Sequence, residues 1–508
     1  MIEPEKKQLL FVNMEYAQNE INEPINVDVL LQYFPTELFD KSNVTIMYRD
    51  FFKGQIVDIK KYDIVLISTK ISSLSEMQAL LDTCEGKLVI VGGILAICAG
   101  YELACLYPEV IFNTGEAESN IYDILGMAVV AQTIAQLKEM ICRKKTPNVC
   151  FYYEPTGGIY RSKRTVCGLK DKCPPIHHKL NDVIKNDGLV RMETSRGCPW
   201  NKCSFCIMPW KFCGEKWRAF SNEKIEIEIK YLIDNGAREI LFTDEDFVCN
   251  YEHVSSLCSI IKRCTESHKQ AVSFGGSTSV LTLYKLGNSL DFCLQNMHDV
   301  GITHVFLGIE SGSNSQLKRY NKGASVSMNE EIISKLQKYE MEIDVGFIMF
   351  DADTTIEELE DNLNFIEKTG LKDTVSRFAK KLRVTPHTAI YNDYISRDLI
   401  TSDLDIDNLC YDYNFLDSNI ELICLYVDAL DAHILKESYY LQAIIRSTAD
   451  KPIKETAHKR LLSLRECCYL FLRDCVNQYK KNKLLSKSDV QLIYNKYLYL
   501  GGINSDDY

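Results

Sequence analysis

Short apolar runs alternate with helix-length segments over the first 140 residues of the chain. Apolar runs of strand length that are separated in this way predict a parallel sheet covered on both faces. The predicted strands are residues 9–12, 44–47, 64–67, 88–91 and 110–112. Ligands of such sheets bind beyond the carboxyl ends of the strands, so the polar and glycine residues there are candidate ligand contacts. They are Ser68, Gly92, Gly93, Gly115, Glu116 and Glu118.

The rhythm of strand and helix resumes at residue 189 and continues for about six cycles. The predicted strands are residues 190–194, 239–242, 271–275, 304–310, 343–350 and 375–382. Residues 225–233 are amphipathic with a helical period, and residues 355–358 form a capping box that begins another helix. Repeated strand–helix units with polar residues at the strand ends predict a complete or partial barrel whose site lies on that face.

These patterns divide the chain into four segments and place it in the α/β class. Residues 1–140 predict a doubly wound, Rossmann-like parallel sheet, and residues 188–398 predict a partial (β/α)6 barrel. Residues 141–187 contain clustered proline and basic residues with weak periodicity, so we expect a connector there. Residues 399–508 predict a helical C-terminal domain, which we expect to close over the substrate.

Composition describes a folded, thiol-rich protein with an excess of acidic residues. The 508 residues are 46% hydrophobic and 25% charged, and the formal net charge of −12 argues against a general nucleic-acid or anionic-membrane binder. The start of the chain shows no secretory signal, and the longest apolar run, residues 88–101, is too short to span a membrane. We therefore expect a cytoplasmic protein in which most of the 20 cysteines are buried free thiols.

Three cysteines, Cys198, Cys203 and Cys206, fall within nine residues directly after the first predicted barrel strand. Three thiolates on one short loop suit a [4Fe–4S] cluster in which one iron has no protein ligand. A structural zinc ion usually takes four protein ligands, and Cys213 could supply the fourth. Both metal centres are compatible with the spacing at this point, and three unrelated thiols are the weaker interpretation.

The segment Arg196-Gly197-Cys198-Pro199 through Cys203-Ser204-Phe205-Cys206 resembles the signature of radical S-adenosylmethionine (radical SAM) enzymes. That family usually has three residues between its first two cysteines, whereas this chain has four. The resemblance continues in order along the chain, at the ends of the second, fourth, fifth and sixth predicted strands. The matching segments are residues 242–247, 307–313 with Lys322-Gly323, 346–355 and 382–388, and His387 stands where the family usually has glycine.

The resemblance implies that the open iron binds S-adenosylmethionine and that strand-end residues hold the rest of that molecule. Its implied contacts are Asp244 and Asp246 for the ammonium group, Ser277 and Glu310 for the carboxylate or ribose, and Phe205 near the adenine. Ser311 and Leu382, in the matching fourth- and sixth-strand segments, are further implied cofactor contacts. Without the resemblance, Asp244 and Asp246 would be solvated strand ends and Glu310 a cap or a rim ion pair. His387 and Tyr391, near the end of the last barrel strand, are the candidate catalytic residues that face the substrate, although a packing role fits His387 equally well.

The N-terminal sheet resembles the cobalamin-binding domain of one large radical SAM subgroup, through Gly92-Gly93 and the segment 114–118. All 9 histidines lie at position 177 or later, so no histidine of this sheet can bind the lower face of the cobalt. That face is expected to be open or to meet Met14 or Tyr16; a degenerate domain that binds nothing is the alternative. His177 and His178, within the connector, are expected in a solvated turn.

By this resemblance the protein is a cobalamin-dependent enzyme that cleaves S-adenosylmethionine reductively to a 5'-deoxyadenosyl radical. The implied reaction is methylation of an unactivated carbon of a peptide or small molecule, with an electron donor such as flavodoxin or ferredoxin. The alternative is a rearrangement, ring contraction or cyclisation that uses the same cofactors without methyl transfer. Because a fold does not fix a reaction, this step rests on analogy.

Overall fold

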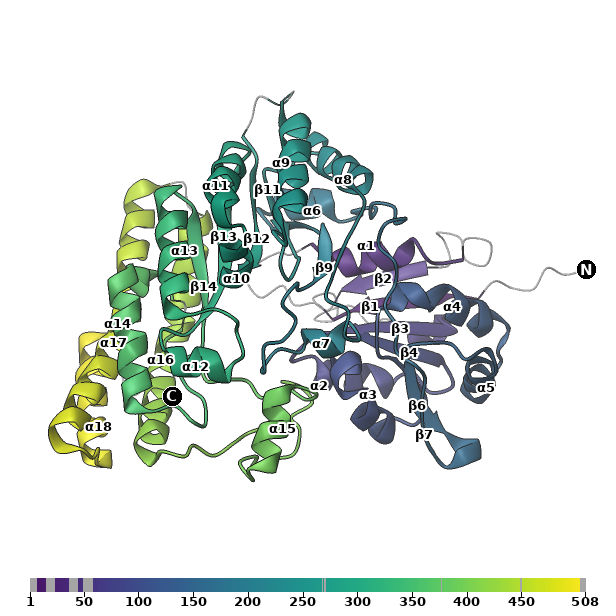
Figure 1. Ribbon diagram of the computed structural model, residues 1–508. Helices are drawn as coiled ribbons and strands as arrows, with labels where there is room; N and C mark the ends of the chain where they lie inside the picture. The colour runs from purple at the N-terminus through teal and green to yellow at the C-terminus, as the bar shows by residue number, and fades with distance from the viewer. Residues whose placement is uncertain are drawn as a thin grey trace, which may run out of the picture.

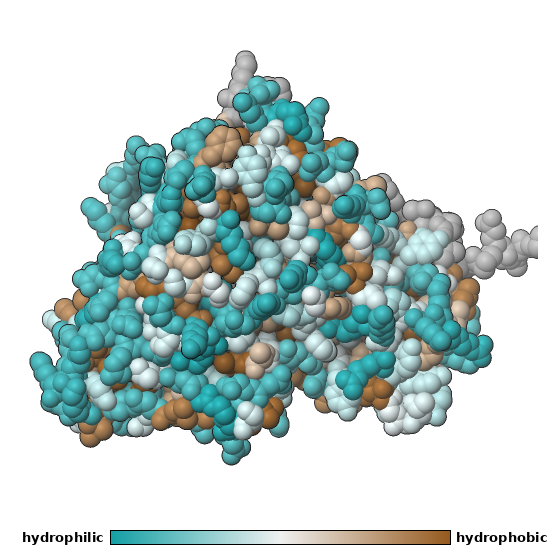
Figure 2. Space-filling model, in the orientation of Figure 1, coloured by the Kyte–Doolittle hydropathy of each residue, from teal (hydrophilic) through white to brown (hydrophobic). Residues whose placement is uncertain are grey.

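The computed structural model divides into an N-terminal sheet domain, a central barrel and a C-terminal group of helices (Figure 1). It describes residues 7–14, 23–35, 44–48, 58–266, 268, 271–375, 377–447 and 450–502. The sheet domain and the C-terminal helices lie on opposite sides of the barrel. Figure 2 shows that hydrophilic residues cover most of the same face of the molecule, with apolar residues scattered among them.

The N-terminal sheet has the order β2-β1-β3-β4-β5-β6-β7, and its first five strands are parallel. These strands are β1 (Leu9–Asn13), β2 (Val44–Tyr48), β3 (Ile64–Thr69), β4 (Leu88–Gly93) and β5 (Val110–Asn113). Alternate side chains enter two separate cores, because successive strand residues point to opposite faces. One face packs against α1 (Ile25–Leu31), α4 (Ile121–Val130) and α5 (Ile134–Lys144), and the other against α2 (Leu74–Leu81) and α3 (Ile94–Leu106). The predicted doubly wound sheet is confirmed.

Part of the expected connector belongs to this sheet. β6 (Val149–Tyr153) pairs antiparallel with β5, and β7 (Gly158–Arg161) pairs antiparallel with β6. Phe151 is fully buried in the core shared with α4 and α5. Pro155 and Gly157 lie in the turn of this hairpin, in a segment that was predicted to be an irregular connector.

The barrel is a five-stranded parallel sheet with the order β14-β13-β12-β11-β8. Its strands are β8 (Val190–Met192), β11 (Glu239–Phe242), β12 (Ser273–Ser279), β13 (Ile302–Glu310) and β14 (Glu342–Phe347). The sixth predicted strand is present only as two bridges, from Val375 to Val345 and from Lys381 to Phe350. The helices α8 (Asn222–Asp234), α9 (Tyr251–Thr265), α11 (Leu290–Asp299), α13 (Val326–Lys338) and α14 (Ile356–Thr369) follow successive strands. α14 begins with the predicted capping box.

The C-terminal helices pack on the outside of the barrel and do not close over its strand ends as expected. They are α16 (Ser418–Ser447), α17 (Lys451–Asn482) and α18 (Lys487–Leu500). Arg473 and Lys480 of α17 form ion pairs with Glu367 and Glu360 of α14. In the part of the chain that the structure describes, no helix is both long and apolar enough to cross a bilayer.

A different segment joins the barrel to the sheet domain. After α15 (Ala389–Ser396), the chain returns to the N-terminal domain, where Asp407 accepts hydrogen bonds from the backbone N–H groups of Ser72 and Leu74. Leu409 is buried in the core formed with α2 and α3. The sheet domain and the barrel are therefore held together by residues that are distant in sequence.

Candidate active site

The cysteine loop begins at a short hairpin beyond β8. β9 (Ser195–Gly197) pairs antiparallel with β10 (Trp217–Ala219), and α7 (Met208–Lys211) follows the loop. Gly197 has a φ of +95°, and a Cβ there would collide with the carbonyl oxygen of Lys216, so only glycine fits directly before Cys198.

Two barrel segments hold the middle of this loop. The N–H of Ser204 donates to the carbonyl oxygen of Tyr320 at 2.9 Å, and the N–H of Ile390 donates to the carbonyl oxygen of Ser204 at 2.8 Å. Phe205 meets Tyr320 edge to face, with ring centroids 5.5 Å apart. The backbone of the loop is thus fixed by the segment after β13 and by the start of α15.

Burial raises the pKa of the Cys203 thiol to about 12 and also raises the pKa values of Cys198 and Cys206. Thiolates at these positions therefore need a compensating positive charge, which bound iron would supply. Within the described residues, no three His, Cys, Asp or Glu side chains converge closely enough to hold a single ion. A [4Fe–4S] cluster makes a different demand, because each thiolate binds its own iron. The donor set fits such a cluster.

A buried ion pair lies beside the three cysteines. Lys322 Nζ is 2.9 Å from Glu310 Oε1, and both side chains are largely buried. Burial alone would lower the pKa of Lys322, but Glu310 and Cys203 raise it, so the ammonium group stays charged. Glu310 has a φ of +68°, which is uncommon for a residue with a Cβ and marks a constrained strand end. Glu310 was predicted as a cofactor contact, whereas Lys322 was part of a matching segment with no predicted role.

Asp244 and Asp246 are fully engaged inside the barrel. The carboxylate of Asp244 accepts hydrogen bonds from the backbone N–H and hydroxyl of Thr194 and from the hydroxyl of Ser195. Burial raises its pKa to about 7, although these bonds act in the opposite direction. The hydroxyl donors to Asp246 are Thr278, Ser279 and Thr282. Both carboxylates therefore brace the strand ends, which does not favour direct contact with an ammonium group.

Glu245, between these two aspartates, contacts the cysteine loop but was not among the predicted site residues. Its carboxylate accepts from the backbone N–H of Gly197 at 2.9 Å and pairs with Lys211 of α7 at 2.8 Å. It thus contacts both ends of the cysteine loop. Residues 243–246 lie beyond the end of β11, so no strand alternation indicated which of the three carboxylates contacts the loop.

The remaining predicted cofactor contacts differ in how far their side chains are buried or bonded to other residues. Ser277 is partly buried on β12, and its carbonyl oxygen accepts from the N–H of Phe247. The hydroxyl of Ser311 is buried and bonded to Asn362, so it belongs to the packing behind β13. Leu382 is buried in the small core that also contacts Phe205. The roles implied for these residues stay predictions.

Both predicted catalytic rings contact other aromatic rings. His387 stacks on Trp210, with centroids 3.8 Å apart, and its Nε2 donates to the carbonyl oxygen of Cys98 at 2.9 Å. Burial lowers the pKa of His387, which favours the neutral imidazole near pH 7. Tyr391 stacks on Tyr411 with centroids 4.5 Å apart. The contacts of His387 fit the packing alternative for this residue.

Gly92 and Gly93, at the carboxyl end of β4, form what we call the glycine edge of the N-terminal sheet. The space beside Gly93 is filled by backbone, whereas the space beside Gly92 is not. A Cβ on Gly93, which has a φ of +92°, would lie 2.6 Å from the backbone nitrogen of Thr69 and closer still to its carbonyl oxygen. A Cβ on Gly92 would meet only Asn113, at 3.8 Å. The hydroxyl of Ser68 accepts from Asn26, and Gly115 packs against Asn148. The position beside Gly92 therefore has room for a Cβ, whereas the position beside Gly93 has none.

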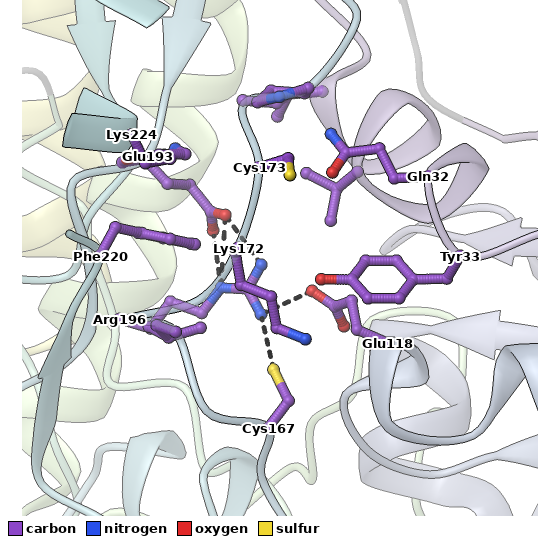
Figure 3. Close-up of a pocket in the computed structure, with 14 residues that line it drawn as sticks. Gln32, Tyr33, Glu118, Cys167, Lys172, Cys173, Glu193, Arg196, Phe220 and Lys224 are labelled. Atoms are coloured by element: carbon purple, nitrogen blue, oxygen red, sulfur yellow. Dashed lines mark hydrogen bonds and ion pairs between the residues drawn. The ribbon is translucent and has the colours of Figure 1, made fainter. Parts of the chain in front are cut away.

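Glu116 and Glu118 bind the barrel, although they were predicted as ligand contacts. Glu116 pairs with Arg218 at 2.6 Å and with Arg196 at 3.3 Å. Figure 3 shows Arg196 between Glu193 and Glu118, and the ion pair with Glu118 measures 2.7 Å. Burial opposes ionisation of Glu116, but the two arginines outweigh it and hold its pKa at about 2. Arg196 also pairs with Glu193. These carboxylates neutralise buried guanidinium groups across the domain boundary.

His178 lies in an exposed turn, as expected, whereas the other connector histidine, His177, does not. His177 is buried, with Nδ1 2.7 Å from Glu23 and Nε2 3.2 Å from Glu228. His178 contacts Asp28. Met14 is buried in the core of the sheet domain, and Tyr16 lies outside the described residues.

The other seventeen cysteines are free thiols, but they are not all buried. Eleven are buried and three, Cys105, Cys173 and Cys213, are exposed. Cys213 has a φ of +56° and follows α7.

Comparison with known proteins identifies the barrel. Residues 192–366 match the family model of the radical SAM superfamily. The chain is 24% identical over 298 residues to 4'-phospho-dehydrooxetanocin synthase of Priestia megaterium, and this match covers 56% of the chain and 38% of that protein. It is 27% identical over 237 residues to bacteriochlorophyllide d C-8(2)-methyltransferase of Chlorobaculum tepidum, which covers 44% and 49%. The matches span less than half of these relatives' length.

Two solved structures share the whole architecture. One is the cobalamin-dependent S-adenosylmethionine radical enzyme OxsB with aqua-cobalamin bound, with a TM-score of 0.82, 17% identity and coverage of 98% of this chain and 79% of that one. The other is the radical S-adenosylmethionine methyltransferase TsrM of Kitasatospora setae with cobalamin and a [4Fe–4S] cluster bound. Its TM-score is 0.67 at 13% identity, with coverage of 92% and 99%. At these identities the likeness establishes the fold.

Proposed function

Residues 192–366 are a radical SAM domain, and on this premise we propose that the protein is a cobalamin-dependent radical SAM methyltransferase. The proposed substrate is a peptide or small molecule that is methylated at an unactivated carbon. When bound, the cluster supplies the electron that cleaves S-adenosylmethionine, and cobalamin carries the methyl group. The proposed electron donor to the cluster is a protein such as flavodoxin or ferredoxin. We also propose a reducing, cytoplasmic location, which the free state of all 20 cysteines supports.

One observation carries this proposal: the cysteine loop and the glycine edge of the sheet domain are tied together within a single chain. Cys198, Cys203 and Cys206 lie at the mouth of the barrel, where they would hold the cluster. Gly92, with open space beside it, lies at the carboxyl end of a parallel strand, where cobalamin would bind.

Other residues of the chain would support these two sites. Lys322 places a buried positive charge beside the thiolates, and Glu310 orients it through their ion pair. Glu245 fixes the start of the cysteine loop and α7 through Gly197 and Lys211. Phe205, within the loop, presents an apolar ring.

The test is anaerobic turnover of the reconstituted full chain with S-adenosylmethionine, hydroxocobalamin and a chemical reductant. We expect 5'-deoxyadenosine and S-adenosylhomocysteine, because one molecule of S-adenosylmethionine is cleaved and another donates methyl. Cys203→Ser should form no 5'-deoxyadenosine above background, whereas Cys213→Ser should match the wild type. A chain that takes up zinc and no iron would contradict the proposal.

Labelled methyl groups separate methylation from the alternative reactions. With S-[methyl-¹³C]adenosylmethionine and extracts of candidate substrates, methylation transfers the label to product. Formation of 5'-deoxyadenosine without any labelled product would instead indicate rearrangement, ring contraction or cyclisation, and would refute methyl transfer.

A further inference from the structure

His387 holds a backbone conformation that suits glycine. Its φ is +64°, in the left-handed region that residues with a Cβ rarely adopt. A residue with a Cβ that is held in this conformation points to a contact made by its side chain.

That contact is with Trp210, which lies in α7 directly after the cysteine loop. The two rings are nearly parallel, at 16°, with centroids 3.8 Å apart. The guanidinium of Arg164 lies 4.5 Å from the centroid of the same indole, and its Nε donates to the carbonyl oxygen of Thr114 at 2.7 Å. Trp210 is therefore held by residues from both sides of the domain boundary.

The stacked rings both bind one point of the sheet domain, the kink of α3. Trp210 Nε1 donates to the carbonyl oxygen of Ile97 at 3.0 Å, and His387 Nε2 donates to that of Cys98 at 2.9 Å. Ala99 has a non-helical φ of −126° and ψ of 27°, which divides α3 into two parts. The two ring N–H groups thus bond to the two carbonyl groups directly before this break, where a helix ladder is commonly interrupted.

The two sides of this contact lead directly to the two cofactor sites. Gly93 is the N-cap of α3, so the kink lies just beyond the glycine edge. Trp210 lies four residues after Cys206. We propose that Trp210 and His387 are positioning residues that fix the cysteine loop against the glycine edge and thereby set the distance between cluster and cobalamin. This inference rests on the proposed function.

His387→Gly is the most informative variant, because glycine suits the backbone and only the side-chain contacts are lost. Trp210→Phe is the second variant; it keeps a ring for stacking but removes the donor to Ile97. Glu340→Gly is the matched control, because Glu340 also has a positive φ, of +53°, and is exposed away from both sites. It relieves the same kind of backbone strain without touching the stacked rings.

The measurement is the magnetic interaction between the reduced cluster and cob(II)alamin, which depends steeply on their separation. The full chain is reconstituted with iron, sulfide and hydroxocobalamin, analysed for iron and cobalt, reduced, and studied by pulsed EPR. We expect His387→Gly and Trp210→Phe to retain both metals but to show a displaced or broadened distance distribution. Glu340→Gly should give the wild-type distribution. A wild-type distribution in both variants would overturn the inference.

Failure of the proposed function has a different signature, because the wild-type chain would then bind no cluster or no cobalamin. Hydrogen exchange of the cofactor-free chain decides the inference in that case. If the rings join the two segments, His387→Gly should speed exchange both in α7 and in α3 around Ala99. Faster exchange confined to the backbone near position 387 would count against it.

Discussion

Gly92 and Gly93 are adjacent in sequence but are expected to respond in opposite ways to substitution by alanine. Gly93 has a φ of +92° and a ψ of −172°, a region that is essentially restricted to glycine. A Cβ there would also press on the backbone of Thr69. Gly92 has an ordinary backbone, and its nearest neighbour would be Asn113 at 3.8 Å. One glycine is thus required by the fold, and the other is required only if a ligand lies beside it.

The expected magnitudes follow from these contacts. Gly93→Ala combines backbone strain with overpacking and should cost roughly 2–6 kcal/mol of local stability. Gly92→Ala meets no clash and should stabilise the strand by about 0.4–1 kcal/mol, because the unfolded chain loses entropy. A ligand packed against Gly92 would however meet the new methyl group, which should weaken its binding roughly 5- to 150-fold.

Two measurements separate stability from binding. Hydrogen exchange of the β3 and β4 amides reports local stability without interference from the other domains. Absorbance titration with hydroxocobalamin reports affinity. Gly126→Ala in α4 is the control, because its Cβ would meet nothing within 4 Å and lies away from the strand ends. If Gly92→Ala binds hydroxocobalamin as tightly as the wild type, the ligand does not lie along this edge.

Three further predictions concern the cluster, the domain boundary and pH. Cys203→Ser should lower reconstituted iron and abolish 5'-deoxyadenosine formation, whereas Cys213→Ser should retain both, by iron analysis and chromatography. Glu116→Gln removes the negative charge that balances Arg218 and Arg196 and should cost about 3 kcal/mol, read as faster hydrogen exchange of residues 114–118. Burial alone would lower the pKa of His177, but Glu228 and Glu23 raise it to about 9. The wild type should therefore be more stable than His177→Gln, by on the order of 3 kcal/mol below pH 6.5, and lose this advantage as pH rises through 9, by urea unfolding at each pH.

The strands of the N-terminal sheet were predictable because a strand that is buried on both faces has an unbroken run of apolar residues. β4 is such a run, and its ends were correct to within two residues. The barrel strands β11 and β13 were also located, although buried and more exposed positions alternate along them. The hairpin of β6 and β7 was missed, because its turn residues resemble those of an irregular link and its strands are short.

Polar residues were harder to place, because their partners are remote in sequence. Glu116 lies at a strand end that favours ligands in this fold class, but the arginines that bind it lie 80 and 102 positions away. His177 closely follows two prolines and was predicted to be solvated. It is instead buried, and its ring nitrogens contact carboxylates that lie 154 and 51 positions away. Short-range patterns carry information about local structure and contain none about such pairs.

The cysteine loop is attached to the sheet domain on both of its sides, by contacts of different chemistry. Before the loop, Arg196 forms ion pairs with Glu116 and Glu118. After the loop, Trp210 donates a neutral hydrogen bond to the kink of α3. The ionic contact is largely buried, so salt should screen it little, and the neutral contact is insensitive to pH in the range where His387 is uncharged. Because the two attachments flank the same loop, the separation of the two proposed cofactors is a property of the folded chain and does not need to be created by substrate binding.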